Sequence, residues 1–461
     1  MDIPRTGEAE PSRHKSASMN QRAMGRRATN QRAMDQLQTQ SKEQPRARPF
    51  QTGAELAIAR CRQLACLSED PGGTRRTFLS PPMREVHREI TSWLQKLGAN
   101  VRIDAAGNLR GFYPAAQSGA PRLLIGSHLD TVPNAGAYDG VLGVLLGIAL
   151  LTALDGEMLP FGIEVVGFSE EEGVRFGEPF IGSRALVGRL DEQLLNRQDA
   201  NTVTVRQAIE NFGLHPENIS EAHVPASTLA YLEFHIEQGP VLETLKRPLG
   251  VVEAIAGQSR LEFIFVGRAN HAGTTPMHLR RDCIAAAAEW ISAVEHLAQS
   301  TPGLVATVGK IEAKPGATNV IAGEVLLTLD VRHSSNAVRI RAVDDLIRKS
   351  EEIAQRRGLS VRRNVLLNQQ AVAMDPFLVN QIEAAIRQTG CEPHRMASGA
   401  GHDAMILAEN VPAAMIFLRT PGGISHDPAE SVIVEDVEKA IECGMHLLRR
   451  LASSSEFLKR T

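Results

Sequence analysis

The chain lacks a basic excess, an apolar run of membrane length and a paired set of cysteines, and each shortage excludes a class of protein. Its net charge of -3 over 461 residues offers little to neutralise phosphates, so no nucleic-acid partner is expected. The longest apolar run, Val141–Leu154, is shorter than the roughly 20 residues that span a bilayer. It therefore predicts a buried helix and no membrane association. Neither G-x-S-x-G nor G-x-x-x-x-G-K-[ST] occurs, so serine-nucleophile and P-loop chemistry have no support.

The five cysteines are odd in number and show no C-x-x-C spacing. They predict reduced thiols, and the N-terminus has no apolar signal-peptide region, so a cytoplasmic protein is expected. Cys61 and Cys66 could be offered as a metal pair. No His or Cys cluster joins them, however, and buried thiols are the favoured interpretation.

Residues 1 to about 50 differ in composition from the rest of the chain. They hold ten Lys/Arg against five Asp/Glu, repeat NQRAM at 20–24 and 30–34, and contain hardly any aliphatic residues. Such a segment buries too little apolar surface to offset its ordering entropy, so a disordered tail is predicted. A basic targeting sequence and a start codon placed too early, with Met34 as the true start, are the alternatives.

From about residue 54, helix-patterned segments alternate with short apolar runs of strand length. Pro81–Leu97 has helical periodicity, whereas Leu123–Ile125 and Ile163–Phe168 are strand-like and end in polar residues. This alternation predicts an α/β fold with a mostly parallel sheet. Ligands gather beyond the carboxyl ends of strands in such sheets, and both His128 and Glu170–Glu172 follow a strand end.

A different rhythm runs from about residue 251 to residue 367. The predicted order is β-α-β-β-α-β, the split ferredoxin-like unit. Its predicted elements are Leu261–Val266, Asp282–Ala298, Val305–Ile311, Val325–Val331, Val338–Arg357 and Leu359–Leu366. We therefore predict a tail over 1–50, a catalytic metal-binding domain over 51–250 and 368–461, and an inserted domain over 251–367.

The segment Gly126–Gly140, GSHLDTVPNAGAYDG, is the most informative stretch of the chain. It gathers His128, Asp130 and Asp139 in a turn-rich loop after a strand. Imidazole and carboxylate are ligands of divalent metals such as zinc or manganese. Taken alone, a histidine beside an aspartate in a loop is more often a hydrogen-bonded surface pair.

Four further clusters change that balance. The glutamates Glu170–Glu172 in FSEEEGVRFG are typical of a solvated face, but here they follow an apolar strand and precede a turn. Like charges held together in that way indicate a metal or a raised pKa. The other clusters hold His235 with Glu237, His271, and His426. Each histidine alone is more often structural, yet five clusters, most at strand ends of one sheet, are hard to explain that way.

Together these motifs resemble those of M20-type binuclear metallohydrolases, and within them the allantoate amidohydrolase and N-carbamoyl-L-amino-acid hydrolase group. GSHLDTVPNAGAYDG, SEEEGVRFG, HIEQGPVLE, NHAGTTPM, SGAGHDA and GISHDPAE occur in that order within residues 54–455. The resemblance implies two divalent ions per subunit, zinc or manganese with cobalt or nickel as alternatives. It also implies a homodimer in which the inserted domain mediates dimerisation and acts as a lid.

The resemblance implies five metal ligands: His128, Asp139, Glu172, His235 and His426. Asp139 would bridge the two ions. His128 and His235 would bind one ion, and Glu172 and His426 the other.

Further residues match other positions of the family pattern. Asp130 resembles the carboxylate that orients the His128 imidazole. Glu171 resembles the general base, and His271 the residue that reaches over the active site from the partner subunit to steady the oxyanion. His402, in SGAGHDA, lies in one more matching motif. The implied substrate-binding residues are Gln238, His271, Asn319 and Arg332.

Two of these positions bear on the substrate. Peptidase and deacylase relatives usually carry Asp or Glu where this chain has His235, and the histidine resembles the branch that cleaves ureido groups. Arg332 offers a planar fork suited to a substrate carboxylate, unless it simply pairs with nearby Asp330 at the surface.

The implied activity is hydrolysis of the carbamoyl C–N bond of allantoate or of an N-carbamoyl-L-amino acid, with release of ammonia and carbon dioxide. These two small ureido acids share the same recognisable groups, so the sequence does not choose between them. An M20 dipeptidase or N-acyl-amino-acid deacylase is the alternative activity. A non-catalytic binding protein of the same fold is a more distant one.

Overall fold

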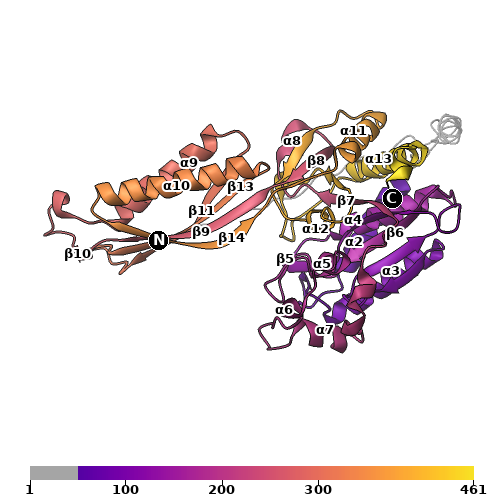
Figure 1. Cartoon of the computed structure of the whole chain (residues 1–461), viewed down its shortest axis with the longest axis horizontal. Coiled ribbons are helices and arrows are strands. Elements are labelled where there is room, and N and C mark those ends of the chain that lie inside the picture. The colour runs from indigo at the N-terminus through magenta and orange to yellow at the C-terminus, as the bar shows by residue number, and fades with distance from the viewer. Residues whose placement is uncertain (1–49, 461) are drawn as a thin grey trace, which may run out of the picture. The chain divides into compact units, whose positions relative to one another are not determined.

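The computed structural model of the protein describes residues 50–460. The predictions made for the tail at 1–49 therefore lie outside the described residues. In the described part, most strands belong to one of two large sheets (Figure 1). No helix within residues 50–460 is both long and apolar enough to cross a membrane.

The larger sheet has nine strands in the order β15-β8-β17-β7-β4-β6-β3-β2, with β16 beside β8. Its four central strands run parallel: β17 (Ala413–Leu418), β7 (Thr228–Ile236), β4 (Arg122–His128) and β6 (Gly162–Phe168). Five further strands flank them: β2 (Asn100–Ile103), β3 (Leu109–Tyr113), β8 (Leu249–Ile255), β15 (Val372–Ala373) and β16 (Arg395–Ser398). The predicted α/β fold with a mostly parallel sheet is confirmed.

Helices cover this sheet, which explains why β6 and β7 are buried along their whole length. The helix α4 (Val141–Leu154) packs on β4, β6 and β7, and twelve of its residues are buried, so the predicted buried helix is confirmed. At Gly143 a Cβ would lie 2.1 Å from the carbonyl oxygen of Phe234, so only glycine lets α4 approach β7 this closely.

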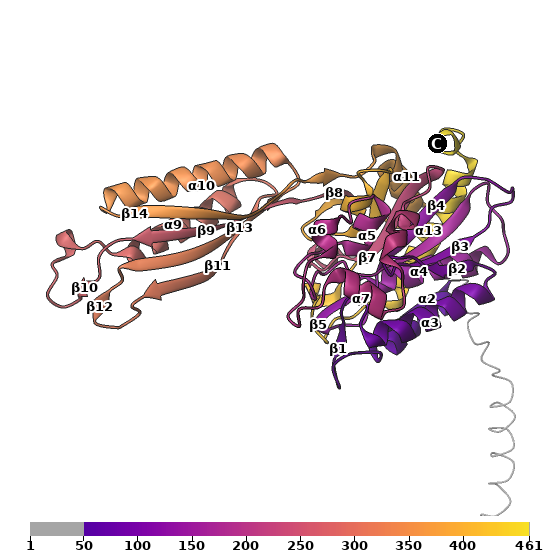
Figure 2. The ribbon, with the colours of Figure 1, turned by 60° about the horizontal axis from the view of Figure 1, so that its bottom comes forward.

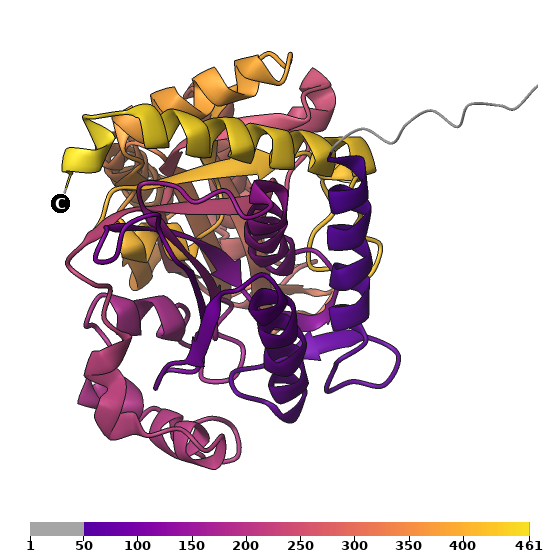
Figure 3. The same cartoon turned by 90° about the vertical axis from the view of Figure 1, so that its right-hand side faces the viewer.

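A second layer of helices packs around α4. Figure 3 shows α13 (Val434–Ser453) lying beside α2 (Gln51–Ala65) and α11 (Pro376–Gln388). The helix α3 (Pro81–Lys96) packs on β2 and β3, as the periodicity of that segment predicts. The remaining helices near this sheet are α5 (Ile181–Leu186), α6 (Glu192–Leu195), α7 (Val205–Asn211), η1 (Pro216–Ala222), α8 (Val241–Leu245), α12 (Asp403–Leu407), η3 (Pro421–Gly423) and η4 (Phe457–Lys459).

The smaller sheet has four antiparallel strands in the order β11-β13-β9-β14. Both α9 and α10 pack on it and on each other (Figure 2). The elements are β9 (Gly257–Val266), α9 (Cys283–Ser300), β11 (Val305–Lys314), β13 (Glu324–His333), α10 (Asn336–Arg356) and β14 (Ser360–Gln369). Their chain order is the predicted β-α-β-β-α-β. The alternation predicted for β13 is also confirmed, since its buried residues are Val325, Leu327, Leu329 and Val331.

The core of the smaller sheet centres on Trp290 of α9. Its ring lies 4.3 Å from that of Phe263, and its indole N–H donates to the carbonyl oxygen of Leu346 in α10. Burial of a large aromatic ring whose one polar group is paired stabilises the contact of both helices with the sheet. A short pair of strands, β10 (Asn270–His271) and β12 (Val320–Ile321), and the turn η2 (Met277–Leu279) were not predicted.

The chain passes from the larger sheet to the smaller one at Ala256, between β8 and β9. Residues 251–255, assigned from the sequence to the inserted domain, pair with β17 and β16 of the larger sheet instead. The domain limits themselves remain a prediction.

Two local predictions were wrong. The segment 126–140 is not one loop, because β4 continues to His128 and Thr131–Ala135 forms β5, which pairs with β1 (Thr74–Arg76). Of the two neighbouring thiols, Cys61 is buried but Cys66 is exposed, because it lies just past the end of α2.

Candidate metal centre

The five predicted ligands lie together beyond the carboxyl ends of the parallel strands. His128 is the last residue of β4, His235 is near the end of β7, and Glu172 follows β6. His426 follows β17 and η3, while Asp139 lies just before α4. Parallel strands end at the same edge of a sheet, so segments far apart in the sequence deliver their side chains to one place.

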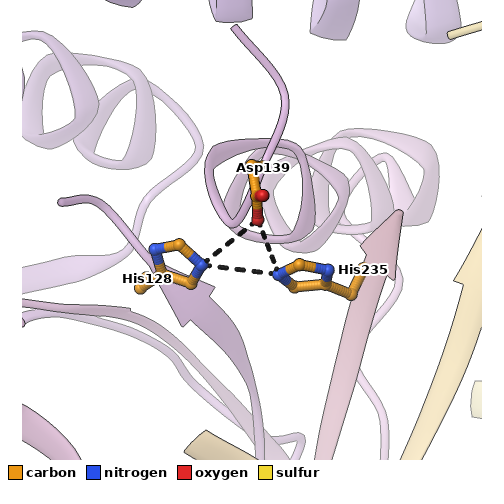
Figure 4. A group of neighbouring side chains, drawn as sticks. All are labelled: His128, Asp139 and His235. Atoms are coloured by element: carbon orange, nitrogen blue, oxygen red, sulfur yellow. Dashed lines mark hydrogen bonds and ion pairs between the residues drawn. The ribbon is translucent and has the colours of Figure 1, made fainter. Parts of the chain in front are cut away.

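The first ligand set consists of His128, Asp139 and His235 (Figure 4). The Nε2 atoms of His128 and His235 lie 3.6 and 3.2 Å from Asp139 Oδ1. The two Nε2 atoms are 3.4 Å apart. All three side chains are buried.

The tautomers of both histidines follow from their other ring nitrogen. His128 Nδ1 lies 3.0 Å from the carbonyl oxygen of Asp130, and His235 Nδ1 lies 2.9 Å from that of Ile236. A carbonyl oxygen only accepts, so each Nδ1 carries the hydrogen of the neutral ring. Each Nε2 then presents a lone pair toward Asp139 Oδ1, an arrangement that is repulsive unless a cation lies among the three atoms.

The second ligand set consists of Asp139, Glu172 and His426. His426 Nε2 lies 3.4 Å from Asp139 Oδ2 and 3.5 Å from Glu172 Oε1. The Asp139 carboxylate therefore directs one oxygen to each set. The imidazole of His426 is 48% exposed, so the second set is open on one side.

The side chains present fit two divalent ions. Asp139 Oδ1 is buried and has no hydrogen-bond partner among the described residues. An unpaired buried acceptor is costly, and a cation would compensate it. Imidazole nitrogens and carboxylate oxygens are the donors that zinc and manganese take.

The carboxyl and imidazole groups of the two sets shift one another's pKa values. Burial disfavours the charged form of Asp139, but the three neighbouring imidazoles of His128, His235 and His426 outweigh it and hold its pKa well below the ordinary value. Burial likewise lowers the pKa of His128, yet the carboxylates of Asp130 and Asp139 raise it well above the usual range. Burial raises the pKa of Glu172 to about 7. Metal ions would displace the protons of these imidazole and carboxyl groups on binding.

Glu171 is buried beside the ligands, and burial raises its pKa well above the ordinary value. Its backbone N–H donates to Asp130 Oδ1 at 2.9 Å, and that of Glu172 donates to Asp130 Oδ2 at 3.0 Å. The Asp130 carboxylate is thus engaged chiefly with this turn. Its Oδ1 also lies 3.5 Å from His128 Nδ1, and the carbonyl oxygen of the same residue lies 3.0 Å from that nitrogen. That the carboxylate orients His128 remains a prediction.

One glycine is required by the ring of His128. Gly140 has a φ of 67°, and a Cβ there would lie 2.4 Å from His128 Nε2. A side chain at this position would strain the backbone and push the imidazole away from Asp139.

Behind the first set lies a buried polar cluster that contains Glu233 and His402. The His402 ring packs edge-on against His235 at 4.5 Å, and its Nε2 lies 2.8 Å from Ser398 Oγ. Burial lowers the pKa of His402 well below the usual range and so disfavours the charged form of its ring. Glu233, His235 and His402 could formally hold an ion, but both nitrogens of His235 are already directed elsewhere. The cluster therefore supports His235. Glu233 was missed in the sequence, where its signal is a carboxylate within an apolar strand.

Gln238 lies beside the second ligand set, since its side-chain Nε2 donates a hydrogen bond to Asp139 Oδ2 at 2.8 Å. Its φ of 59° is left-handed, and its neighbour Glu237 accepts the N–H groups of Val241 and Leu242 at the start of α8. Ser425, which sequence reasoning missed, also donates to Asp139 Oδ2, at 2.5 Å.

His271 and Asn319 lie elsewhere, at the β10–β12 pair, where the N–H of Ala272 donates to the carbonyl oxygen of Asn319. Among the described residues, neither side chain forms a hydrogen bond or ion pair with the ligand sets. His271 Nδ1 accepts the N–H groups of Gly273 and Thr274, at 3.1 and 3.2 Å, so the hydrogen of its neutral ring is on Nε2. The exposed ring presents an N–H donor.

Arg332 pairs with Asp330, as the alternative interpretation of the sequence held. Its Nε and Nη2 lie 3.0 Å from the two oxygens of Asp330, and its Nη1 donates to the carbonyl oxygen of Gly399 at 2.7 Å. The guanidinium also lines a cavity of about 970 Å³ that reaches Gln238. Asp330 takes the Nε–Nη2 edge of the fork and Gly399 takes one hydrogen of Nη1, so one hydrogen of Nη1 and one of Nη2 are left for a second partner.

Comparisons with known proteins agree with this geometry. The sequence pattern of peptidase family M20/M25/M40 matches residues 124–450. An N-carbamoyl-L-amino acid amidohydrolase of Geobacillus stearothermophilus is 38% identical, over 83% of this chain and 94% of its own length. An allantoate deiminase of Arabidopsis thaliana is also 38% identical, over 86% of this chain and 82% of its own. The crystal structure of an amidase of the hydantoinase/carbamoylase family from Burkholderia multivorans has a TM-score of 0.81 at 31% identity, over 86% and 97% of the two chains.

Proposed function

Since this chain belongs to peptidase family M20/M25/M40 and is an amidohydrolase of the hydantoinase/carbamoylase type, acting on C–N bonds, we propose that it hydrolyses the carbamoyl C–N bond of a ureido acid. The candidate substrates are allantoate and N-carbamoyl-L-amino acids, and the products include ammonia and carbon dioxide. The observation that carries the proposal is that the two oxygens of Asp139 face separate ligand sets beside the buried Glu171.

In this proposal His128 and His235 would hold one ion, Glu172 and His426 would hold the other, and Asp139 would contribute to both. Zinc or manganese suits these ligands, with cobalt or nickel as alternatives. Bound ions of this kind supply an activated water at neutral pH and polarise the carbonyl oxygen of the substrate. A cytoplasmic location is proposed as well, supported by the free state of all five cysteines.

Glu171 is the proposed general base. Its main chain is fixed by Asp130, and its burial raises the pKa of the carboxyl, which suits a group that must both take and return a proton. It would accept a proton from the attacking water and deliver it to the departing nitrogen of the substrate.

We propose a homodimer in which the His271 ring of one subunit serves the site of the other. Two observations support it: the ring presents an Nε2–H donor, and it makes no hydrogen bond to the ligand sets of its own chain within residues 50–460. A neutral N–H donor suits the stabilisation of negative charge that develops on the substrate oxygen. Asn319 lies beside His271 and would bind substrate with it.

The test of the function is hydrolysis of a panel of allantoate, several N-carbamoyl-L-amino acids, N-acyl amino acids and dipeptides, with the metal varied. Ammonia release is measured for the ureido acids, and the freed amino acid is measured for the N-acyl amino acids and dipeptides. We expect turnover of at least one ureido acid to exceed that of every dipeptide by 100-fold or more in kcat/KM. Preference for a dipeptide or an N-acyl amino acid would contradict the proposal and favour a peptidase or deacylase.

Glu171→Gln is expected to lower kcat by roughly 10²–10⁴-fold, the usual contribution of a general base, and to retain both ions. The amide keeps the shape of the side chain but cannot accept the proton from water. Steady-state kinetics and metal analysis by mass spectrometry measure the two effects. Asp139→Ala is the matched comparison and should lose metal and activity together. Wild-type turnover of Glu171→Gln with both ions bound would remove Glu171 from this role.

Arg332→Lys is expected to lower kcat/KM at least about tenfold, which corresponds to about 1.4 kcal/mol, because lysine keeps the charge but not the fork. Arg260→Lys is the matched control, since Arg260 Nε donates to the same Asp330 oxygen at 3.0 Å and should change kcat/KM less than about twofold. For substrates whose carboxylate is converted to an amide, kcat/KM should be low in the wild type and nearly unchanged by Arg332→Lys. Equal losses on both substrates would assign Arg332 a structural role.

Complementation tests the shared site. His271→Ala and Glu171→Gln should each be nearly inactive, and each mixed dimer should contain one site with both residues intact. Mixing equal amounts under subunit exchange should then recover about a quarter of wild-type activity, because half of the dimers are mixed and half of their sites are complete. Exchange is verified with differently tagged subunits. If exchange is complete and activity stays at the level of the parent variants, His271 does not act in trans.

A further inference from the structure

Glu430 connects two segments that each carry a proposed metal ligand. It lies four residues after His426, and its side chain is buried, with 6% of the residue exposed. Its Oε1 accepts the backbone N–H groups of Tyr138 and Asp139 at 2.7 and 3.0 Å. One carboxylate oxygen therefore fixes the main chain of the residue that faces both ligand sets.

Glu430 is itself held in place from the other side. Its N–H donates to the carbonyl oxygen of Asp427 at 3.0 Å, and the N–H of Ala429 donates to Asp427 Oδ1 at 2.8 Å. These bonds form a tight turn after His426, so the position of Glu430 relative to His426 is defined. A rigid link thus runs from the His426 segment to the Asp139 segment.

The neighbouring glycine Gly136 leaves room for this link. A Cβ at Gly136 would lie 2.4 Å from Glu430 Cβ and 2.6 Å from Oε1, closer than non-bonded atoms approach. The φ of Gly136 is not in the left-handed region, so its requirement is for space. An alanine there would displace the carboxylate without altering its chemistry.

We propose that Glu430 is a positioning residue of the metal centre, which holds the Asp139 backbone at the distance from His426 that lets one carboxylate serve both ions. The proposal rests on the ligand roles proposed above for Asp139 and His426. Groups that orient metal ligands through hydrogen bonds typically change metal affinity 10–100-fold when removed.

The first test is metal binding by the full-length protein after removal of metal, with Zn²⁺ titrated calorimetrically and Co²⁺ followed by its visible absorption. Glu430→Ala is expected to bind Zn²⁺ about 10–100-fold more weakly and to change the Co²⁺ spectrum. Glu430→Gln is expected to retain affinity within about threefold, because its amide oxygen can accept the same two N–H groups.

Gly136→Ala is the second test, and it leaves Glu430 in place. It is expected to weaken Zn²⁺ binding in the same direction as Glu430→Ala. The clash involves Glu430 Cβ, which alanine retains, so the double variant is Gly136→Ala/Glu430→Gly, and its affinity should equal that of Glu430→Gly alone. Such non-additivity is the signature of two residues acting through one contact. Additive losses would overturn the proposed link.

Asp199→Ala is the control for loss of another carboxylate that accepts two backbone N–H groups. The Asp199 side chain is 7% exposed, and its Oδ1 accepts the N–H groups of Asn201 and Val203 at 2.8 and 3.0 Å. The Asp199 side chain forms no hydrogen bond with the proposed ligands, so Asp199→Ala should lower Tm without changing Zn²⁺ affinity.

Wild-type Zn²⁺ affinity in a folded Glu430→Ala protein would overturn the proposal. So would equal losses in Glu430→Ala and Glu430→Gln, which would assign the effect to charge and not to position. No substrate enters these measurements, so a failure of the proposed amidohydrolase activity would leave their outcome unchanged.

Discussion

The arrangement of the whole site depends on the Asp139 carboxylate, which is buried between two sets of ligands with one oxygen turned toward each. Taken without cations, this arrangement costs free energy, since Oδ1 has no hydrogen-bond partner among the described residues and carboxylates gather around it. Two divalent ions bound there would remove both costs at once. The residues around Asp139 keep its carboxylate in the position that such binding requires.

Those surrounding residues act mainly through the backbone. Glu430 holds the N–H of Asp139, Asp130 holds those of Glu171 and Glu172, and carbonyl oxygens fix the tautomers of His128 and His235. A backbone contact fixes where a side chain starts, and short side chains such as aspartate then have few ways to deviate. This explains how loops, which are the more variable part of a fold, present ligands at defined distances from a rigid parallel sheet.

The sequence predicts those parts of the molecule that have a periodic pattern or a local cluster of residues of one kind. Alternation in β13, the apolar run of α4 and the clusters at strand ends each have such a pattern, and the sheet and the inserted unit follow from them. The choice of five ligands from those clusters came from the resemblance to the M20 family. Contacts such as Glu430 with Asp139, or the pairing of β5 with β1, join segments far apart in the chain and leave no local signal. Cys66 is exposed because of where α2 ends, a boundary that composition does not define.

The chain divides the proposed reaction between two parts. Every proposed metal ligand, together with Glu171, comes from the larger sheet and its loops, whereas His271 and Asn319 come from the β10–β12 pair next to the smaller sheet. Ligands on one sheet need no other part of the molecule in order to bind metal. Groups on a separate unit can contribute to the transition state only when that unit is brought to a metal site. It follows that metal affinity and turnover depend on different parts of the structure. A substitution confined to the smaller sheet should lower turnover and leave metal affinity unchanged.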